Sequence, residues 1–131
     1  MEQEQFNQRH FSQACIDECY TCATACDFCA TSCLDEAHAQ DMKQCIKLAM
    51  DCAALCRLAA GYMARDSDMA SLICNICAQV CDSCSEECSH HQMAHCQQCA
   101  QACRQCAAEC RRMAAAWRQP AADLGGVAIA H

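Results

Sequence analysis

Cysteine is the residue type in this chain whose side chains are most suited to chemistry, and its spacing is regular. Nineteen of the 131 residues are Cys. In the segment CIDECYTCATACDFCATSC, residues 15–33, successive cysteines are four, three, four, three and four residues apart. The segments CNICAQVCDSCSEEC and CQQCAQACRQCAAEC repeat this spacing, and a sparser version, DCAALC, precedes them. On an α-helix these steps place all the thiols on one stripe.

Such a stripe is suited to binding soft metal ions, because thiolates select Cu(I), Zn(II) or iron–sulfur clusters. Residues four apart on a helix have Cβ atoms about 5–6 Å apart. Metal–sulfur bonds near 2.3 Å place two sulfurs in line about 4–4.6 Å apart, so a two-coordinate Cu(I) fits a CxxxC pair. Zinc prefers a tetrahedron and an iron–sulfur cluster needs four thiolates. Evenly spread thiols therefore favour a row of Cu(I) ions.

Every cysteine is a candidate metal ligand. The set is Cys15, Cys19, Cys22, Cys26, Cys29, Cys33, Cys45, Cys52, Cys56, Cys74, Cys77, Cys81, Cys84, Cys88, Cys96, Cys99, Cys103, Cys106 and Cys110. Bridging thiolates would allow a load on the order of one Cu(I) per cysteine. Binding should release protons, since thiols with a pKa of about 8.5 must become thiolates.

Four helices must carry these stripes, and the sequence predicts them at about residues 9–36, 41–63, 68–89 and 92–117. Their short connections imply antiparallel neighbours. The predicted fold is all-α, an antiparallel up-down-up-down four-helix bundle with a Cys-lined lumen. We expect a single domain over residues 1–117 and a flexible C-terminal tail over 118–131, which contains Pro120 and two glycines.

Turn signals separate the predicted helices. Asp41 with Gln44, and Ser89 with Gln92, have the spacing of capping boxes. Gly61, followed by the polar segment ARDSD, marks a turn after the second helix.

Antiparallel packing would make the two ends of the bundle different. One end would collect polar or soft donors that admit an ion: Glu36, His38, Met42, His90, His91, Met93 and His95. The other would be apolar and sealed by Phe11, Met63, Leu72, Met113 and Trp117. His38, Met42 and His91 continue the Cys stripes, which makes them candidate metal ligands or gate residues. The alternative is that they are ordinary turn and core residues. His90 and His95 are expected on the surface.

Charge and composition exclude other functions. A net charge of −7 and a pI of about 5.2 argue against nucleic acid as a partner. No apolar run approaches the roughly 20 residues of a membrane span. The odd cysteine count argues against a disulfide framework, because at least one thiol would be left over. The opening segment, MEQEQFNQRHFSQ, has neither the basic nor the apolar region of a secretory signal, which argues against an oxidising compartment. We therefore expect a cytoplasmic protein with free thiols.

The repeated CxxxC and CxxC stripes resemble those of the bacterial copper storage proteins, specifically the cytosolic branch, over roughly residues 9–117. The resemblance implies a four-helix bundle whose lumen binds many Cu(I) ions, mainly through CxxxC pairs. It also implies a homotetramer that is loaded from one open end, where cytosolic members use His.

The expected function is cytosolic storage or sequestration of Cu(I), without catalysis. An enzyme would be expected to have one privileged Cys of low pKa beside a base, whereas these cysteines are nearly equivalent. Two alternatives remain open: a zinc or mixed-metal buffer of metallothionein type, and a thiol redox protein. The expected partners are copper ions, further copies of the chain, and a copper chaperone or acceptor protein.

Overall fold

The computed structural model describes residues 2–117, with side chains from Ser12 onward. Four helices make up most of this part: α1 (Glu2–Leu34), α2 (Lys43–Ala64), α3 (Ala70–Ser89) and α4 (Ala94–Ala116). A short 3-10 helix, η1 (Ala39–Met42), leads into α2. The described residues contain no β-strand. The Phe11 side chain and the predicted tail over 118–131 lie outside the described part, so those expectations remain predictions.

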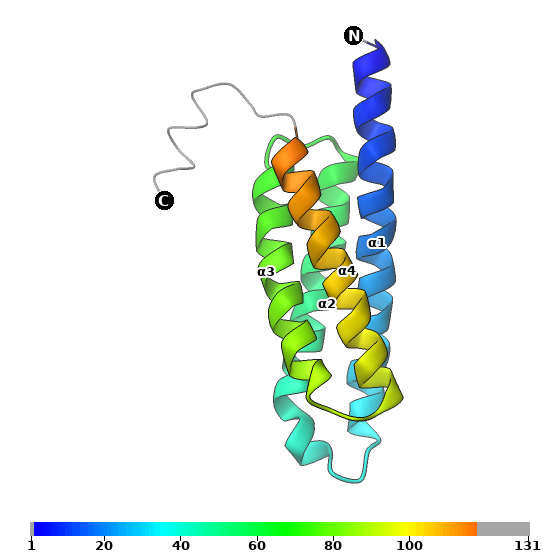
Figure 1. Ribbon diagram of the computed structural model, residues 1–131, viewed down its shortest axis with the longest axis vertical. Coiled ribbons are helices and arrows are strands. Elements are labelled where there is room, and N and C mark those ends of the chain that lie inside the picture. The colour runs from blue at the N-terminus through cyan, green and yellow to red at the C-terminus, as the bar shows by residue number, and fades with distance from the viewer. Residues whose placement is uncertain (1, 118–131) are drawn as a thin grey trace, which may run out of the picture.

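The helices form an antiparallel bundle in which each runs opposite to the next (Figure 1). α1 packs against α2 and α4, and α3 packs against the same two helices. The connections α1–α2 and α3–α4 lie at one end, which we call the mouth (Figure 1). The α2–α3 connection and the end of α4 lie at the other, the far end. The predicted fold class is confirmed.

The interior of the bundle, which we call the lumen, is lined by cysteine. All the Cys side chains have 0% exposure. Small alanines such as Ala23, Ala53, Ala78 and Ala100 are buried beside them and let the helices approach closely. Larger apolar residues pack against this core from the helix flanks: Ile46, Leu48, Leu55, Ile73 and Val80.

Several other apolar residues lie on the outer surface. Phe28 is 61% exposed and Met50 is 58% exposed. Leu58 and Ile76 are also exposed. These four side chains do not wedge between the helices of their own chain, so they are available for contacts outside it.

The far end is closed by buried apolar side chains. Met63, Met113 and Trp117 are each almost fully buried. The Trp117 indole Nε1 donates a hydrogen bond to the Ser67 carbonyl at 3.2 Å, which satisfies its polar atom. Leu72 was expected here, but it is 52% exposed and faces outward.

Both predicted capping boxes are wrong. α2 begins after Met42 and α4 begins after Met93, and neither N-cap has a side-chain hydrogen bond. Asp41 instead lies within η1, and the Ser89 hydroxyl donates to the Glu86 carbonyl at 2.8 Å. Capping spacing is a local signal, and here the two connections follow other backbone paths.

The end of α2 is set by Asp66 and not by Gly61, which lies inside the helix. Asp66 has a left-handed φ of 57°. The amides of Asp66 and Ser67 donate to the carbonyls of Met63 and Tyr62, each at 3.0 Å. This is the Schellman pattern that stops a helix, and Asp is one of the few residues besides Gly that tolerates the required conformation.

Candidate metal centre

The four Cys stripes meet in the lumen and form a continuous network of sulfur contacts. Its shortest contacts join different helices: the Sγ atoms of Cys45 and Cys88 are 3.3 Å apart, and those of Cys52 and Cys81 are 3.4 Å apart. Within one helix, six of the eight CxxxC pairs have Sγ atoms 3.9–4.0 Å apart: Cys22/Cys26, Cys29/Cys33, Cys52/Cys56, Cys77/Cys81, Cys84/Cys88 and Cys106/Cys110.

The network runs through the whole length of the lumen. Contacts of 3.3–4.0 Å connect, in order, Cys33, Cys45, Cys88, Cys84, Cys99, Cys26, Cys103, Cys52, Cys56, Cys106, Cys110 and Cys15. Cys33 lies at the mouth and Cys15 near the far end. A thiophilic ion that enters at the mouth can therefore move inward by exchanging one sulfur ligand for the next.

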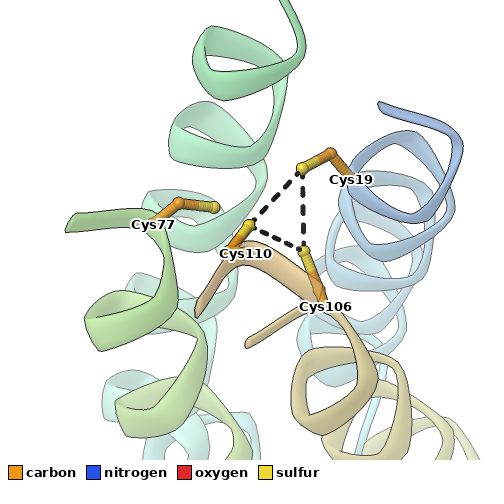
Figure 2. Close-up of side chains that lie close together, drawn as sticks. All are labelled: Cys19, Cys77, Cys106 and Cys110. Carbon is orange, nitrogen blue, oxygen red and sulfur yellow. Dashed lines mark hydrogen bonds between the residues drawn. The ribbon is translucent and has the colours of Figure 1, made fainter. Parts of the chain in front are cut away.

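The sulfurs also gather in groups of four. Figure 2 shows one such group, formed by Cys19 of α1, Cys77 of α3, and Cys106 and Cys110 of α4. All four Sγ atoms lie within 4.8 Å of one another. Three further groups share no member with it or with one another: Cys22, Cys52, Cys56 and Cys81; Cys26, Cys84, Cys99 and Cys103; and Cys29, Cys33, Cys45 and Cys96.

This geometry is compatible with more than one metal. A linear Cu(I) dithiolate needs sulfurs about 4.6 Å apart, and a tetrahedral zinc site needs about 3.8 Å. Sulfurs 3.3–4.0 Å apart reach the first spacing with small rotamer shifts and already match the second. The sequence indicated pairs along each helix, whereas the structure adds contacts between helices that are as short or shorter, so the geometry suits both copper and zinc.

Two thiols at the mouth, those of Cys33 and Cys96, have raised pKa values. Burial raises the pKa of the Cys33 thiol to about 11, and the nearby Cys45 sulfur adds to the effect. Burial also raises the pKa of Cys96, again with Cys45 contributing. A metal ion that binds these sulfurs must therefore displace protons.

A cavity of about 230 Å³ lies at the mouth. It is lined by Glu36, Ala37, His38, Asp41, Met42, His91 and Met93. The three stripe residues His38, Met42 and His91 are thus brought together beside the entrance to the lumen. The His91 Nε2 atom lies 3.1 Å from a Glu87 carboxylate oxygen, while His38 is exposed and Met42 is buried.

His95 was expected on the surface, and this prediction is wrong. Its side chain is only 12% exposed. The Nδ1 atom lies 3.5 Å from the Cys29 Sγ and 3.6 Å from the Cys96 Sγ. On the other side of the ring, Nε2 lies 2.8 Å from a Glu36 carboxylate oxygen. His95 is therefore a further candidate ligand at the mouth.

Two spacings in the sequence could have indicated this arrangement. His95 is four residues before Cys99, so it repeats the CxxxC spacing with His in the first position. Glu36 is three residues after Cys33 and continues the stripe of α1 past the end of that helix. Neither spacing reveals that the two side chains meet, because this depends on how the two mouth connections fold.

Comparisons with known proteins agree with the site. A family model described as copper storage protein matches residues 8–115. The uncharacterized cysteine-rich protein YhjQ of Bacillus subtilis is 45% identical over 90 residues, which cover 69% of this chain and 83% of that protein.

Solved structures are similar in both sequence and fold. The Cu(I)-bound copper storage protein BsCsp3 is 44% identical, with a TM-score of 0.77 over 79% of this chain and 98% of its own. Apo-Csp3 (copper storage protein 3) from Bacillus subtilis is 46% identical, with a TM-score of 0.75 over 79% of this chain and 98% of its own. A cytosolic copper storage protein from Streptomyces lividans, solved during copper loading with five coppers, is 37% identical, with a TM-score of 0.80 over 82% of this chain and 95% of its own. With a matching family model over most of its length and a lumen of buried thiols, this chain belongs to the copper storage protein family.

Proposed function

We propose that this chain stores or sequesters many Cu(I) ions in the cytosol, without catalysing a reaction on them. The observation that carries the proposal is the unbroken network of buried sulfurs from the mouth to the far end, in which neighbouring thiols lie close enough to bind the same ion. The proposed ligands are all nineteen cysteines, with His38, Met42, His91 and His95 serving the entrance. A cytosolic location is supported by the Streptomyces lividans relative, which is described as cytosolic.

Copper is the cargo of this site. Cu(I) first binds donors at the mouth, then passes inward between neighbouring thiols, each of which loses its proton as it becomes a ligand. The far end is sealed by Met63, Met113 and Trp117, so ions enter and leave at the mouth. No part of this process needs a privileged nucleophile or base, which is why a storage role is favoured over an enzymatic one.

A zinc buffer is the second candidate, and one observation favours it. The lumen contains four separate groups of four sulfurs, each suited to a tetrahedral ion. The number of ions bound distinguishes the two metals. Zinc in such groups would saturate at about four to six ions per chain, whereas bridged Cu(I) would reach a number on the order of the cysteine count.

The test is an anaerobic titration of the fully reduced protein with Cu(I) in competition with a chromogenic chelator, followed by native mass spectrometry. Uptake of well over about ten ions per chain is expected. Saturation at about four to six ions, or a preference for zinc, would favour the zinc buffer. If neither metal bound tightly, the redox alternative would be favoured, in which neighbouring thiols such as Cys45 and Cys88 form disulfides.

We further propose that the chain forms a homotetramer and exchanges copper with a chaperone or acceptor protein. The exposed apolar side chains of Phe28, Met50 and Leu58 support an assembly, because isolated chains gain from covering such groups. We propose subunit contacts on α2 and α3, which carry the exposed side chains of Met50, Leu58 and Ile76. The exposure of Tyr20 and Phe28 extends the proposed contact surface to α1.

Within the described helices, none is long and apolar enough to span a bilayer.

A further inference from the structure

We propose that Glu36 is a positioning residue for copper entry, which holds the His95 ring so that its Nδ1 atom faces the sulfurs of Cys29 and Cys96. This inference rests on the proposed storage function and concerns how ions reach the thiols. Glu36 would bind no copper itself and would act through His95.

The first step of the argument is the direction of the hydrogen bond. The Glu36 carboxylate and His95 Nε2 are 2.8 Å apart. An ionised carboxylate only accepts hydrogen bonds, so Nε2 carries the proton and donates it. In a neutral imidazole the other nitrogen then has a free lone pair. Glu36 therefore makes Nδ1 the atom that can accept a thiol proton or bind a metal ion.

The second step is what this lone pair faces. Nδ1 lies 3.5 Å from the Cys29 sulfur and 3.6 Å from the Cys96 sulfur. The Cys29 and Cys96 sulfurs are themselves 3.8 Å apart. One nitrogen and two sulfurs thus form a three-donor set at the mouth. Cys29 and Cys96 also contact Cys33, through which the set joins the network.

The third step is why the ring needs a partner. His95 is the second residue of α4, and the backbone of the preceding N-cap residue, Met93, is extended, so the ring lies at the very start of its helix. Glu36 comes from the other side, just beyond the end of α1, where its amide donates to the Cys33 carbonyl at 3.2 Å. The carboxylate therefore ties the ring to the helix that carries Cys29. Mutation of a residue that orients a metal-binding His in this way commonly lowers metal affinity or activity by about 10–100-fold.

The experiment measures the rate of Cu(I) uptake from a chelator complex by anaerobic stopped flow, together with the final number of ions bound. Glu36→Ala is expected to slow uptake by about tenfold while the final load stays unchanged. Glu36→Gln keeps an oxygen that accepts from Nε2 and should restore most of the rate. Asp35→Ala is the matched control: it removes a neighbouring exposed carboxylate, and hence the same charge, without contacting His95.

A double-mutant cycle then identifies the route of the effect. His95→Ala should slow uptake at least as much as Glu36→Ala, and adding Glu36→Ala to it should have no further effect. Equal slowing by Asp35→Ala and Glu36→Ala would overturn the inference, because general charge attraction would explain both. Unchanged uptake in Glu36→Ala, with slow uptake in His95→Ala, would also overturn it while leaving the storage function intact. A low final load in the unaltered protein would instead count against the storage function itself.

Discussion

At the scale of single residues, cysteine in this lumen combines two roles that usually need different side chains. Each thiol is fully buried like a small apolar group, and each is also a proposed metal ligand. A protonated thiol is neutral, so a lumen of protonated thiols contains no uncompensated charge from its ligands. The bundle can therefore fold before copper arrives, unlike a site built from buried carboxylates.

Removing one pair of ligands should reduce capacity by a small step. In a Cys52→Ser, Cys81→Ser double variant, we expect a loss of about two Cu(I) ions, since the remaining sulfurs still contact one another. The metal-free variant should also lose about 1–3 kcal/mol of unfolding free energy for each poorly paired hydroxyl. Native mass spectrometry and urea unfolding measure the two effects.

The control for that variant is Ala53→Ser, Ala78→Ser, which buries two hydroxyls at positions with 2% and 1% exposure without removing a thiol. It should lose stability but keep its copper load. Complete loss of copper binding in the cysteine variant would contradict storage, because it would reveal a single indispensable cluster.

The metal-free protein should lose stability in alkaline solution. The pKa of Cys33 is raised to about 11 in the folded state, above the value of about 8.5 for a thiol in the unfolded chain. Between these two values the folded state holds more protons than the unfolded state, so the free energy of unfolding falls as pH rises. Below about pH 8.5 both states are protonated and this contribution is constant.

Urea unfolding under argon with a reductant, at several pH values across this window, measures the effect. The Cys33→Ala variant should show a shallower decline with pH, because one of the contributing thiols is gone. A stability that rises across the same window would contradict a buried, protonated Cys33.

At the scale of the helices, the heptad spacing was sufficient to predict the fold and the lining of the lumen. Thiols at three- and four-residue steps must share one helix face, and four such faces can be buried together only in a bundle. The ends of the helices were harder to predict. Asp66 ends α2 through a left-handed backbone, and the short helix η1, which ends at Met42, lies between α1 and α2. Neither feature has a periodic signal.

The same reason explains which mouth residues were predicted. His38, Met42 and His91 continue a stripe, and they line one cavity as expected. His95 was missed because it lies beside the Cys stripe of α4, and its burial depends on the path of the α3–α4 connection. Periodicity locates residues within a helix, but it does not describe the loops that bring helix ends together.

Helix α2 has a gap in its stripe at Ala49, and filling it should increase capacity. Ala49 is fully buried between Cys45 and Cys52. Those two cysteines contact Cys88 and Cys81 of α3, so a thiol at position 49 would lie at the level of Cys84. We expect Ala49→Cys to bind about one additional Cu(I), as counted by native mass spectrometry. Ala53→Cys, buried but off the stripe, is the control and should add none. An unchanged load in Ala49→Cys would indicate that ligand number does not set capacity.

At the scale of the whole molecule, the lumen is complete within one chain. All four stripes come from the same polypeptide, and among the described residues the sulfur network is closed off from the outer surface. The exposed apolar side chains lie on the opposite faces of the helices. The proposed assembly and copper binding would therefore use different surfaces, and they should be separable by mutation.

The last prediction tests that separation. Among the described side chains of α1, Phe28 is the most exposed aromatic one, and it lines a surface hollow with Tyr20, Thr21, Thr24 and Ala25. Phe28→Glu places a charge where a subunit contact is proposed, so it should convert the proposed tetramer to smaller species in analytical ultracentrifugation. Gln101→Glu, which adds the same charge on the exposed face of α4, should leave the assembly unchanged. The number of Cu(I) ions per chain should be the same in both variants and in the unaltered protein. If the number of Cu(I) ions per chain fell on dissociation, residues of neighbouring subunits would have to contribute to the copper sites. A lumen formed by one chain alone should keep its copper when the subunits separate.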